Sequence, residues 1–434
     1  MGLIRPLYTA ALAVGLTITA PAYAVRAARR GTGLALGERL GAVPAAAAAL
    51  RGRRPLWVHA VSVGEVTAAA PLLRAIKTRY PDVALLVSTV TATGRQTVTE
   101  RVPQADATVY FPLDLPAAVA RALDAVEPGL FLSVETELWP NFLHALAGRG
   151  VPAFLVNARL TERSARRYGW AGAVFRPALA GLSGVAAQPA VDAKRFASIG
   201  ADPNRILITG NLKFDQGVQE ADGAIRRDEL GLAPEDRLWV AGSTHPGEET
   251  QLLDVYRRVR TREPRLVLLL APRHLDRLAQ VEALVRDAGC EPIRRSLARG
   301  ATRTESRPPV IVLDTLGELA GLYHEAAVAF VGGTLVPVGG HNLLEPAARG
   351  KPVLFGPHTH KCAEIAQALL DAGGAARVDS VEAMARDLER LLADERLRVR
   401  MGEYGRDMVA RNRGAVERTL AMLDPWLSEL GARP

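Results

Sequence analysis

The feature that most constrains this chain is an alternation of short apolar runs with segments of helical periodicity. Leu56–Val61 and Ala84–Val90 are apolar runs of strand length, and Val66–Tyr80 between them repeats apolar residues at helical spacing. Strands that alternate with helices pair in parallel, because the helix returns the chain to the same end of the sheet. The pattern predicts an α/β fold, which continues as Leu115–Val126 (helix), Leu130–Val134 (strand), Asn141–Gly148 (helix) and Val151–Asn157 (strand).

A second alternating series follows a polar, charged segment, Glu220–Asp236. The 434 residues exceed one ordinary core and suit two domains. We expect two Rossmann-like halves joined by that segment, with ligands in a cleft between them at the carboxyl ends of the strands. The second series has strands at Leu238–Gly242, Leu266–Ala271, Val310–Leu313, Ala327–Val331 and Pro352–Phe355, and helices at Gly247–Arg260, Leu275–Ala288, Gly317–Tyr323, Leu343–Arg349, Val381–Leu392 and Glu395–Leu423.

An uncharged run, Pro6–Val25, precedes the first series, and twenty residues is about the length that crosses a bilayer. Two interpretations compete. Ala22–Ala24 resembles a signal-peptide cleavage site. The arginines that follow the run favour a retained anchor, because basic flanks stay on the cytoplasmic side and would keep the body of the protein there. These are Arg26, Arg29, Arg30, Arg39, Arg51, Arg53 and Arg54. The Ala-rich stretch Gly41–Leu50 leads into Arg51–Pro55, which is predicted to be a linker.

The formal charge of +8 indicates an anionic partner: nucleic acid, a phospholipid surface or a phosphorylated substrate. Nucleic acid is disfavoured, since aromatics are 5% and no recognition motif is present. The two cysteines, Cys290 and Cys362, exclude a disulfide framework and suit a reducing compartment. No metal-ligand spacing occurs, so neither a metal nor a cofactor is expected.

Four candidate residues of the first series follow predicted strands or lie in a loop between the domains. Glu65 stands where a strand turns into a helix, and could accept a proton from a hydroxyl; an ordinary first-turn glutamate is the alternative. Glu135 and Glu137, beside Trp139, suit the rim of a sugar site, or else a solvated loop. Lys213 lies in a Gly/Asn loop that could meet an anion, or that is a simple turn.

In the second series, glycine-rich loops follow the strands. Residues 241–249 join small residues to a helix start, which suits an anion or only a capped helix. Arg273 and His274 end a strand and could contact phosphate, or be surface charge. The most specific segment is 330–346, where two Gly-Gly pairs supply free N–H groups and Glu345 could bind ribose hydroxyls. His358 and His360 fit a polar loop better than a site.

In their order along the chain, these clusters resemble the Kdo transferases, which add 3-deoxy-D-manno-octulosonic acid (Kdo) to the inner core of lipopolysaccharide. The resemblance runs from residue 37 to the last helices. One departure follows His360, where the family pattern continues with Asn and an aromatic residue and this chain has Lys361-Cys362. The resemblance is carried by 37–41, 59–65, 135–141, 157–160, 210–215, 272–274 and 339–346.

The resemblance implies a GT-B fold and an inverting glycosyltransferase. CMP-Kdo would be the donor and a lipid A precursor (lipid IVA) the acceptor. Glu65 would be the proton acceptor, with Glu135 and Lys213 supporting the transition state. The nucleotide would be held by Pro272, Arg273, Leu316, Gly317, Glu318, Asn342, Leu343, Leu344 and Glu345.

Four parts are therefore expected. They are a membrane anchor at 1–30, an acceptor domain at 40–215, a nucleotide-sugar domain at 216–400, and final helices at 401–434 that partly cross back to the first domain. The catalytic domains would face the cytoplasm from the inner membrane. Three other functions stay open: a nucleotide-sugar epimerase, another lipid-linked glycosyltransferase, and a carbohydrate- or lipid-binding protein without turnover.

Overall fold

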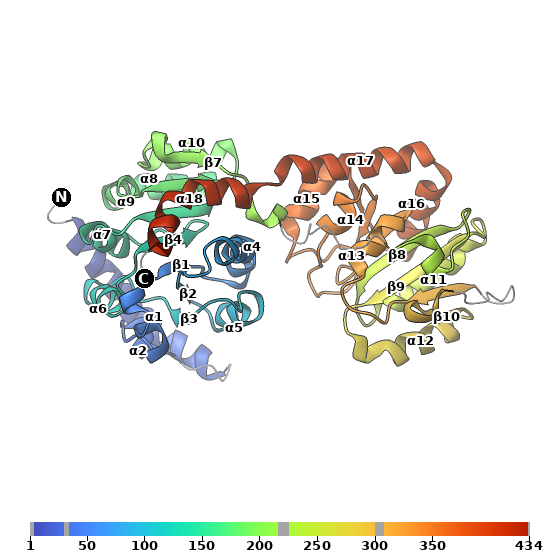
Figure 1. The fold of residues 1–434 in the computed structure, drawn as a ribbon, viewed down its shortest axis with the longest axis horizontal. Helices are drawn as coiled ribbons and strands as arrows, with labels where there is room; N and C mark the ends of the chain where they lie inside the picture. The colour runs from blue at the N-terminus through green and yellow to red at the C-terminus, as the bar shows by residue number, and fades with distance from the viewer. Residues whose placement is uncertain (1–3, 30–33, 216–224, 300–307, 433–434) are drawn as a thin grey trace. The chain divides into compact units, whose positions relative to one another are not determined.

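The structure is a computed structural model that describes residues 4–29, 34–215, 225–299 and 308–432. The chain forms two compact units (Figure 1). The first comprises Met1–Asp215 and Arg413–Pro434, and the second comprises Gln216–Asn412. The last helix, α18 (Ala415–Gly431), therefore belongs to the first unit, among elements from the beginning of the chain.

Within its described residues, the first unit is built on a seven-stranded parallel sheet of order β3-β2-β1-β4-β5-β6-β7. From β1 the chain adds strands on one side, then returns to place β4 on the other side of β1. The connections that leave β1 and β4 therefore diverge, and open α/β sheets bind ligands at such a reversal point. The strands are β1 (Leu56–His59), β2 (Leu85–Thr89), β3 (Ala107–Tyr110), β4 (Leu130–Val134), β5 (Ala153–Ala158), β6 (Gly184–Ala187) and β7 (Ile206–Ile208).

Apolar layers cover both faces of this sheet. Trp57 and Val58 are adjacent on β1 but belong to different core clusters, because successive side chains of a strand point to opposite faces. Helix α18 contributes Leu420 and Leu423 to the cluster of Val58. The helices are α1 (Ile4–Arg29), α2 (Leu36–Arg39), α3 (Ala45–Ala48), α4 (Val63–Arg79), α5 (Ala92–Arg101), α6 (Pro116–Val126), α7 (Pro140–Gly148), α8 (Glu162–Trp170), α9 (Gly172–Ala180) and α10 (Ala190–Ile199).

The described part of the second unit has a parallel sheet of order β10-β11-β9-β8-β12-β13-β14, with its reversal point between β8 and β12. Its strands are β8 (Arg237–Thr244), β9 (Leu266–Pro272), β10 (Glu291–Arg294), β11 (Pro309–Val312), β12 (Val328–Val331), β13 (Val353–Phe355) and β14 (Ala375–Arg377). Its helices are α11 (Glu248–Arg260), α12 (Leu278–Asp287), α13 (Leu319–Leu322), α14 (Leu344–Ala348), α15 (Ala363–Asp371), α16 (Val381–Ala393) and α17 (Glu395–Asn412).

The α/β class and the two parallel sheets expected from the alternation are confirmed. The helical stretch expected at Glu395–Leu423 is divided at Gly414, whose left-handed conformation (φ 84°) separates α17 from α18. The predicted linker, Arg51–Pro55, lies inside the first unit, where Arg51–Arg53 form a short 3-10 helix.

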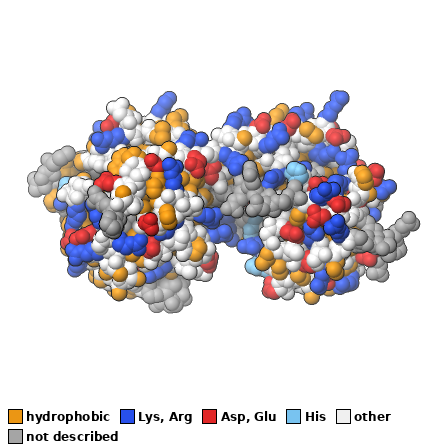
Figure 2. Space-filling view, in the orientation of Figure 1, with side chains coloured by type: hydrophobic (Ala, Val, Ile, Leu, Met, Phe, Trp, Pro, Cys, Tyr) orange, Lys and Arg blue, Asp and Glu red, His pale blue; other side chains and the backbone are white. Residues whose placement is uncertain are grey.

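Part of the predicted interdomain segment, 220–224, lies outside the described residues. The remainder packs in the second unit through Ile225, Leu230 and Leu232. Lys and Arg side chains are spread over both units on the face shown in Figure 2, interspersed with Asp and Glu. None of the described helices has the combination of length and apolar character that spanning a bilayer requires.

Candidate active site

Glu65 occupies the first turn of α4, directly after β1. Its carboxylate accepts hydrogen bonds from the Val61 N–H (2.7 Å) and the Ser62 hydroxyl (3.1 Å), and Ser62 is the N-cap of the helix. An exposed carboxylate in this position would be stabilised in its charged form. Here burial raises the pKa of Glu65 to about 7, and the charges of Glu137 and Glu135 add to the rise.

The loop after β4 brings these two further carboxylates to the same reversal point. Glu135 has a left-handed backbone (φ 63°), and its N–H donates to the carbonyl oxygen of Val156 on β5. A non-glycine residue in this conformation is uncommon and concentrates at functional sites. Burial raises the pKa of Glu137 to about 7 as well. Three carboxylates therefore approach one another where β1 and β4 end.

Lys213 supplies the opposite charge. Lys213 belongs to a short 3-10 helix, Leu212–Asp215, and its Nζ lies 3.4 Å from Glu135 Oε1. Asn157 fixes this helix, because its buried Oδ1 accepts from the Leu212 N–H at 2.9 Å. Asp215 in turn accepts from the N–H groups of Gly414 and Val416, at the start of α18. The structure thus brings Glu65, Glu135 and Lys213 together within the first unit.

Aromatic side chains pack against the Glu135–Trp139 loop through Trp139. Trp139 is half-buried, and its ring centroid lies 5.7 Å from that of Phe111. His59 stacks on Phe111 at 3.7 Å, and its Nδ1 lies 3.0 Å from the Ser88 hydroxyl. Full burial lowers the pKa of His59 to about 3, which keeps its ring neutral.

At the reversal point of the second unit, Glu248 ties the loops after β8 and β12 together. Its fully buried carboxylate accepts from the N–H groups of Gly333 (2.7 Å), Thr334 (3.0 Å), Leu335 (2.9 Å) and His245 (2.9 Å). The two backbones approach so closely that a Cβ on Gly332 would meet a carbonyl oxygen at 2.4 Å. This close approach requires glycine there.

A histidine pair lies above this junction. The Nε2 atoms of His245 and His341 are 2.8 Å apart in nearly parallel rings. One ring must donate and the other accept, so the pair cannot be doubly protonated. Burial lowers the pKa of His341 to about 4, helped by His245 and by the charges of Arg273 and Lys361. Arg273 follows Pro272 at the end of β9 and is thereby placed beside the pair.

The remaining predicted nucleotide residues offer mainly backbone groups. Leu343 and Leu344 are fully buried, so their side chains are not available to a ligand, and the Leu344 N–H donates to Asn342 Oδ1 at 3.0 Å. Asn342 Nδ2 donates to Glu345 (3.1 Å), whose pKa is raised by burial.

The Leu316–Glu318 loop follows β11. The Leu316 side chain is 82% exposed, and Gly317 has φ 85°. Glu318 Oε1 lies 3.5 Å from Arg295 Nη2. Among the residues described, no hydrogen bond or ion pair joins this loop to Arg273 or Glu345.

The departure from the family pattern, Lys361-Cys362, lies against the Gly339-Gly340 loop. The Lys361 N–H and the Cys362 thiol both donate to the Gly339 carbonyl. Burial raises the pKa of the Cys362 thiol to about 11, so the group is protonated at neutral pH. Within the described chain no group of three or more His, Cys, Asp or Glu side chains is arranged to hold a metal.

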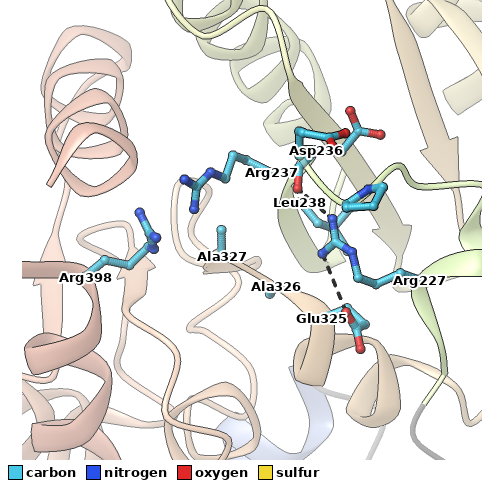
Figure 3. Close-up of a pocket in the computed structure, with 10 residues that line it drawn as sticks. Arg227, Asp236, Arg237, Leu238, Glu325, Ala326, Ala327 and Arg398 are labelled. Carbon is cyan, nitrogen blue, oxygen red and sulfur yellow. Dashed lines mark hydrogen bonds and ion pairs between the residues drawn. The ribbon is translucent and has the colours of Figure 1, made fainter. Parts of the chain in front are cut away.

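A hollow of about 460 Å³ lies at the other end of the second sheet, where β8 and β12 begin. Figure 3 shows Arg237 and Arg398 pointing toward each other there, and Arg227 paired with Glu325. Its arginines are offset by Glu235, Asp236 and Glu325, so the lining does not select one sign of ligand charge.

Four residues of these two clusters were not singled out by the sequence as site residues: Asn157, His245, Glu248 and His341. Glu248 has the sequence signature of a helix-start glutamate, and only the fold shows that it crosses to another loop. Asn157 carried a usable signal, since polar residues that end apolar parallel strands lie at the ligand-binding edge.

Comparison with known proteins agrees with this geometry. The family model described as 3-deoxy-D-manno-octulosonic-acid transferase (kdotransferase) matches residues 35–216, and the model for glycosyl transferases group 1 matches residues 234–408. A 3-deoxy-D-manno-octulosonic acid transferase of Haemophilus influenzae is 39% identical over 376 residues, covering 86% of this chain and 87% of the relative.

The transferase of the same name from Bordetella pertussis is 37% identical over 383 residues, covering 86% of this chain and 87% of the relative. The one from Chlamydia muridarum is 32% identical over 379 residues, covering 86% of each chain. On these matches, the chain is a glycosyltransferase that belongs to the 3-deoxy-D-manno-octulosonic acid transferase family.

Proposed function

We propose that this protein transfers Kdo from CMP-Kdo to a hydroxyl of a lipid A precursor, with inversion, and that Glu65 is the general base. The observation that carries the assignment is the half-buried Glu65 carboxylate at a sheet reversal point, beside the Lys213–Glu135 ion pair. A base works best when its pKa lies near the working pH, and burial places that of Glu65 at about 7.

The proposed reaction is a single displacement. The acceptor oxygen bonds to the anomeric carbon of Kdo, the bond from that carbon to the CMP phosphate breaks, and Glu65 takes the acceptor proton. One base suffices, as in inverting glycosidases, because no covalent sugar intermediate forms. Lys213 would offset negative charge at the reacting centre, and Glu135 would hold Lys213 in place.

The nucleotide would be bound by the second unit. CMP carries one phosphate, and Arg273 with the backbone N–H groups of Asn342–Glu345 offers positive charge and donors for it. Glu345 would accept from the ribose hydroxyls, while Pro272 and the Leu316–Glu318 main chain would contact the base. The neutral His245–His341 pair lies beside Arg273 and supports the same role.

Mass measurement of the products tests the assignment. Purified protein incubated with CMP-Kdo and a lipid A precursor should yield free CMP and an acceptor heavier by Kdo. An isomerised nucleotide sugar formed without acceptor would favour an epimerase instead. Tight CMP-Kdo binding without product would favour a binding protein, and product from other nucleotide sugars alone would favour another lipid-linked transferase.

The pH dependence of transfer follows from the state of Glu65. The base must be ionised, so kcat/KM should rise with pH through about 7 and then level off. Glu137→Gln removes a negative charge that raises the Glu65 pKa and should move this rise to lower pH. A rate that falls across the same interval, or a midpoint that Glu137→Gln leaves unmoved, contradicts the role of Glu65.

We also propose that the protein works on the cytoplasmic face of the inner membrane. The lipid acceptor and the arginines after the Pro6–Val25 run support this location. Helix α1, which contains the run, would make the attachment.

A further inference from the structure

The first turns of α1 are held against the body of the first unit. The Tyr8 hydroxyl donates to Asp114 Oδ2 at 3.0 Å, and Asn141 Nδ2 donates to Thr9 Oγ1 at 3.0 Å. The Asp114 carboxylate also accepts from the N–H groups of Asn141 and Phe142, at the start of α7. Two consecutive residues of α1 are thus tied to the end of the loop that carries Glu135.

Helix α1 packs by one side and leaves another bare. Tyr8, Thr9, Leu12 and Leu16 are half-buried, at spacings that place them on one side of a helix, and α1 packs against α9. The apolar residues on a different side are exposed. This stripe consists of Ile4 (39% exposed), Leu7 (68%), Val14 (59%) and Ile18 (72%).

These contacts conflict with a helix that crosses the bilayer. At 1.5 Å per residue, Tyr8 is about 27 Å from Arg26 along the helix axis, which is close to the thickness of the hydrocarbon core. The body of the protein follows the far end of α1. In a spanning helix, Tyr8 would therefore lie across the membrane from Asp114 and could not reach it.

We propose that α1 lies in the plane of the membrane surface, with its exposed stripe in the interface and both ends on the side of the catalytic units. The inference rests on the proposed membrane location and specifies its topology. An in-plane helix needs an apolar stripe of this kind, whereas a spanning helix is apolar all round.

Charge supports lipid as the occupant of the stripe. The α1 sequence contains no acidic residue and carries Arg5 near its start and Arg26 and Arg29 near its end. Such flanks suit anionic headgroups. Trp170, at the end of α8, is 98% exposed. Two residues before it, Tyr168 adds to the rise in the pKa of Tyr8, which comes first from burial and from Asp114. Exposed tryptophan favours the membrane–water interface.

The topology is tested with single cysteines in the full chain, after Cys290 and Cys362 are replaced by alanine. Pro6→Cys and Arg166→Cys report the start of α1 and the body. A membrane-impermeant maleimide should label both from inside-out membrane vesicles and neither from spheroplasts. Labelling of the two positions from opposite faces overturns the proposal.

Vesicle binding tests the stripe. Leu7→Ser, Val14→Ser and Ile18→Ser together should weaken flotation with phosphatidylethanolamine–phosphatidylglycerol vesicles at least about tenfold, because three apolar side chains lose their burial. The matched control is Ala10→Ser, Ala13→Ser and Ala20→Ser, which adds three serines at exposed positions off the stripe and should bind as wild type.

A stripe variant that floats like the control overturns the proposal. So does a wild-type chain that ignores vesicles but forms a dimer that the stripe variant loses, because a second copy then covers the stripe. Kdo transfer to a detergent-solubilised acceptor tests the proposed function separately from the proposed topology of α1. Product from every variant with altered flotation supports the topology, whereas absence of product in wild type defeats the proposed function and leaves the labelling result standing.

Discussion

Glu65→Gln is expected to lower the rate of Kdo transfer about 10²–10⁴-fold while leaving CMP-Kdo binding and the unfolding transition as in wild type. The amide has the size of the carboxylate but cannot take the acceptor proton at neutral pH. The loss should appear in kcat with little change in KM for the donor, since Glu65 belongs to the first unit and the proposed nucleotide residues belong to the second.

Glutamine isolates the chemistry better than alanine does. The Glu65 side chain accepts from the Val61 N–H next to the N-cap, and Gln can keep that acceptor whereas Ala leaves the N–H unpaired. Glu100→Gln is the matched control, because Glu100 is an exposed helix glutamate on α5 that accepts a hydrogen bond from Gln96 in the same helix. Near-wild-type turnover by Glu65→Gln, or an equal loss in Glu100→Gln, rejects Glu65 as the base.

The sheets could be predicted from sequence because buried parallel strands are continuous apolar runs, as at Leu130–Val134 and Leu266–Pro272. Shorter or more polar strands could not. Ala107–Tyr110 and Glu291–Arg294 lie at sheet edges, where only one neighbour constrains the sequence, and they escaped prediction. The turn at Gly414 was hidden because apolar periodicity continues on both sides of it.

The positions of the site residues could be predicted from the sequence, but their protonation behaviour could not. Glu65 and Glu135 were identifiable because each follows a strand, and the two strands are neighbours across the reversal point. The raised pKa values of Glu65 and Glu137 depend on burial by groups distant in sequence, which no local pattern contains. The Tyr8–Asp114 contact joins residues 106 apart and likewise needed the fold.

Glu248→Ala is expected to destabilise the second unit by at least about 3 kcal/mol, enough to unfold it in part at 37 °C. The carboxylate accepts four backbone N–H bonds from two loops, and its loss leaves buried donors without acceptors. Urea unfolding of the full chain, followed by the fluorescence of the fully buried Trp239, should show the fall. The first unit should unfold as in wild type.

Glu248→Gln should also destabilise the second unit, whereas Glu65→Gln should leave the unfolding transition as in wild type. Each oxygen of Glu248 accepts two N–H groups, Oε1 from Thr334 and Leu335, and Oε2 from Gly333 and His245. An amide replaces one oxygen with a donor, so two N–H groups would face an NH₂ group. The comparison variant is Glu382→Ala, whose side chain forms a surface pair with Arg258 and should change unfolding little. If Glu248→Gln unfolds like wild type, the four-bond clasp does not stabilise the loops, and the placement of His245 and His341 must depend on other contacts.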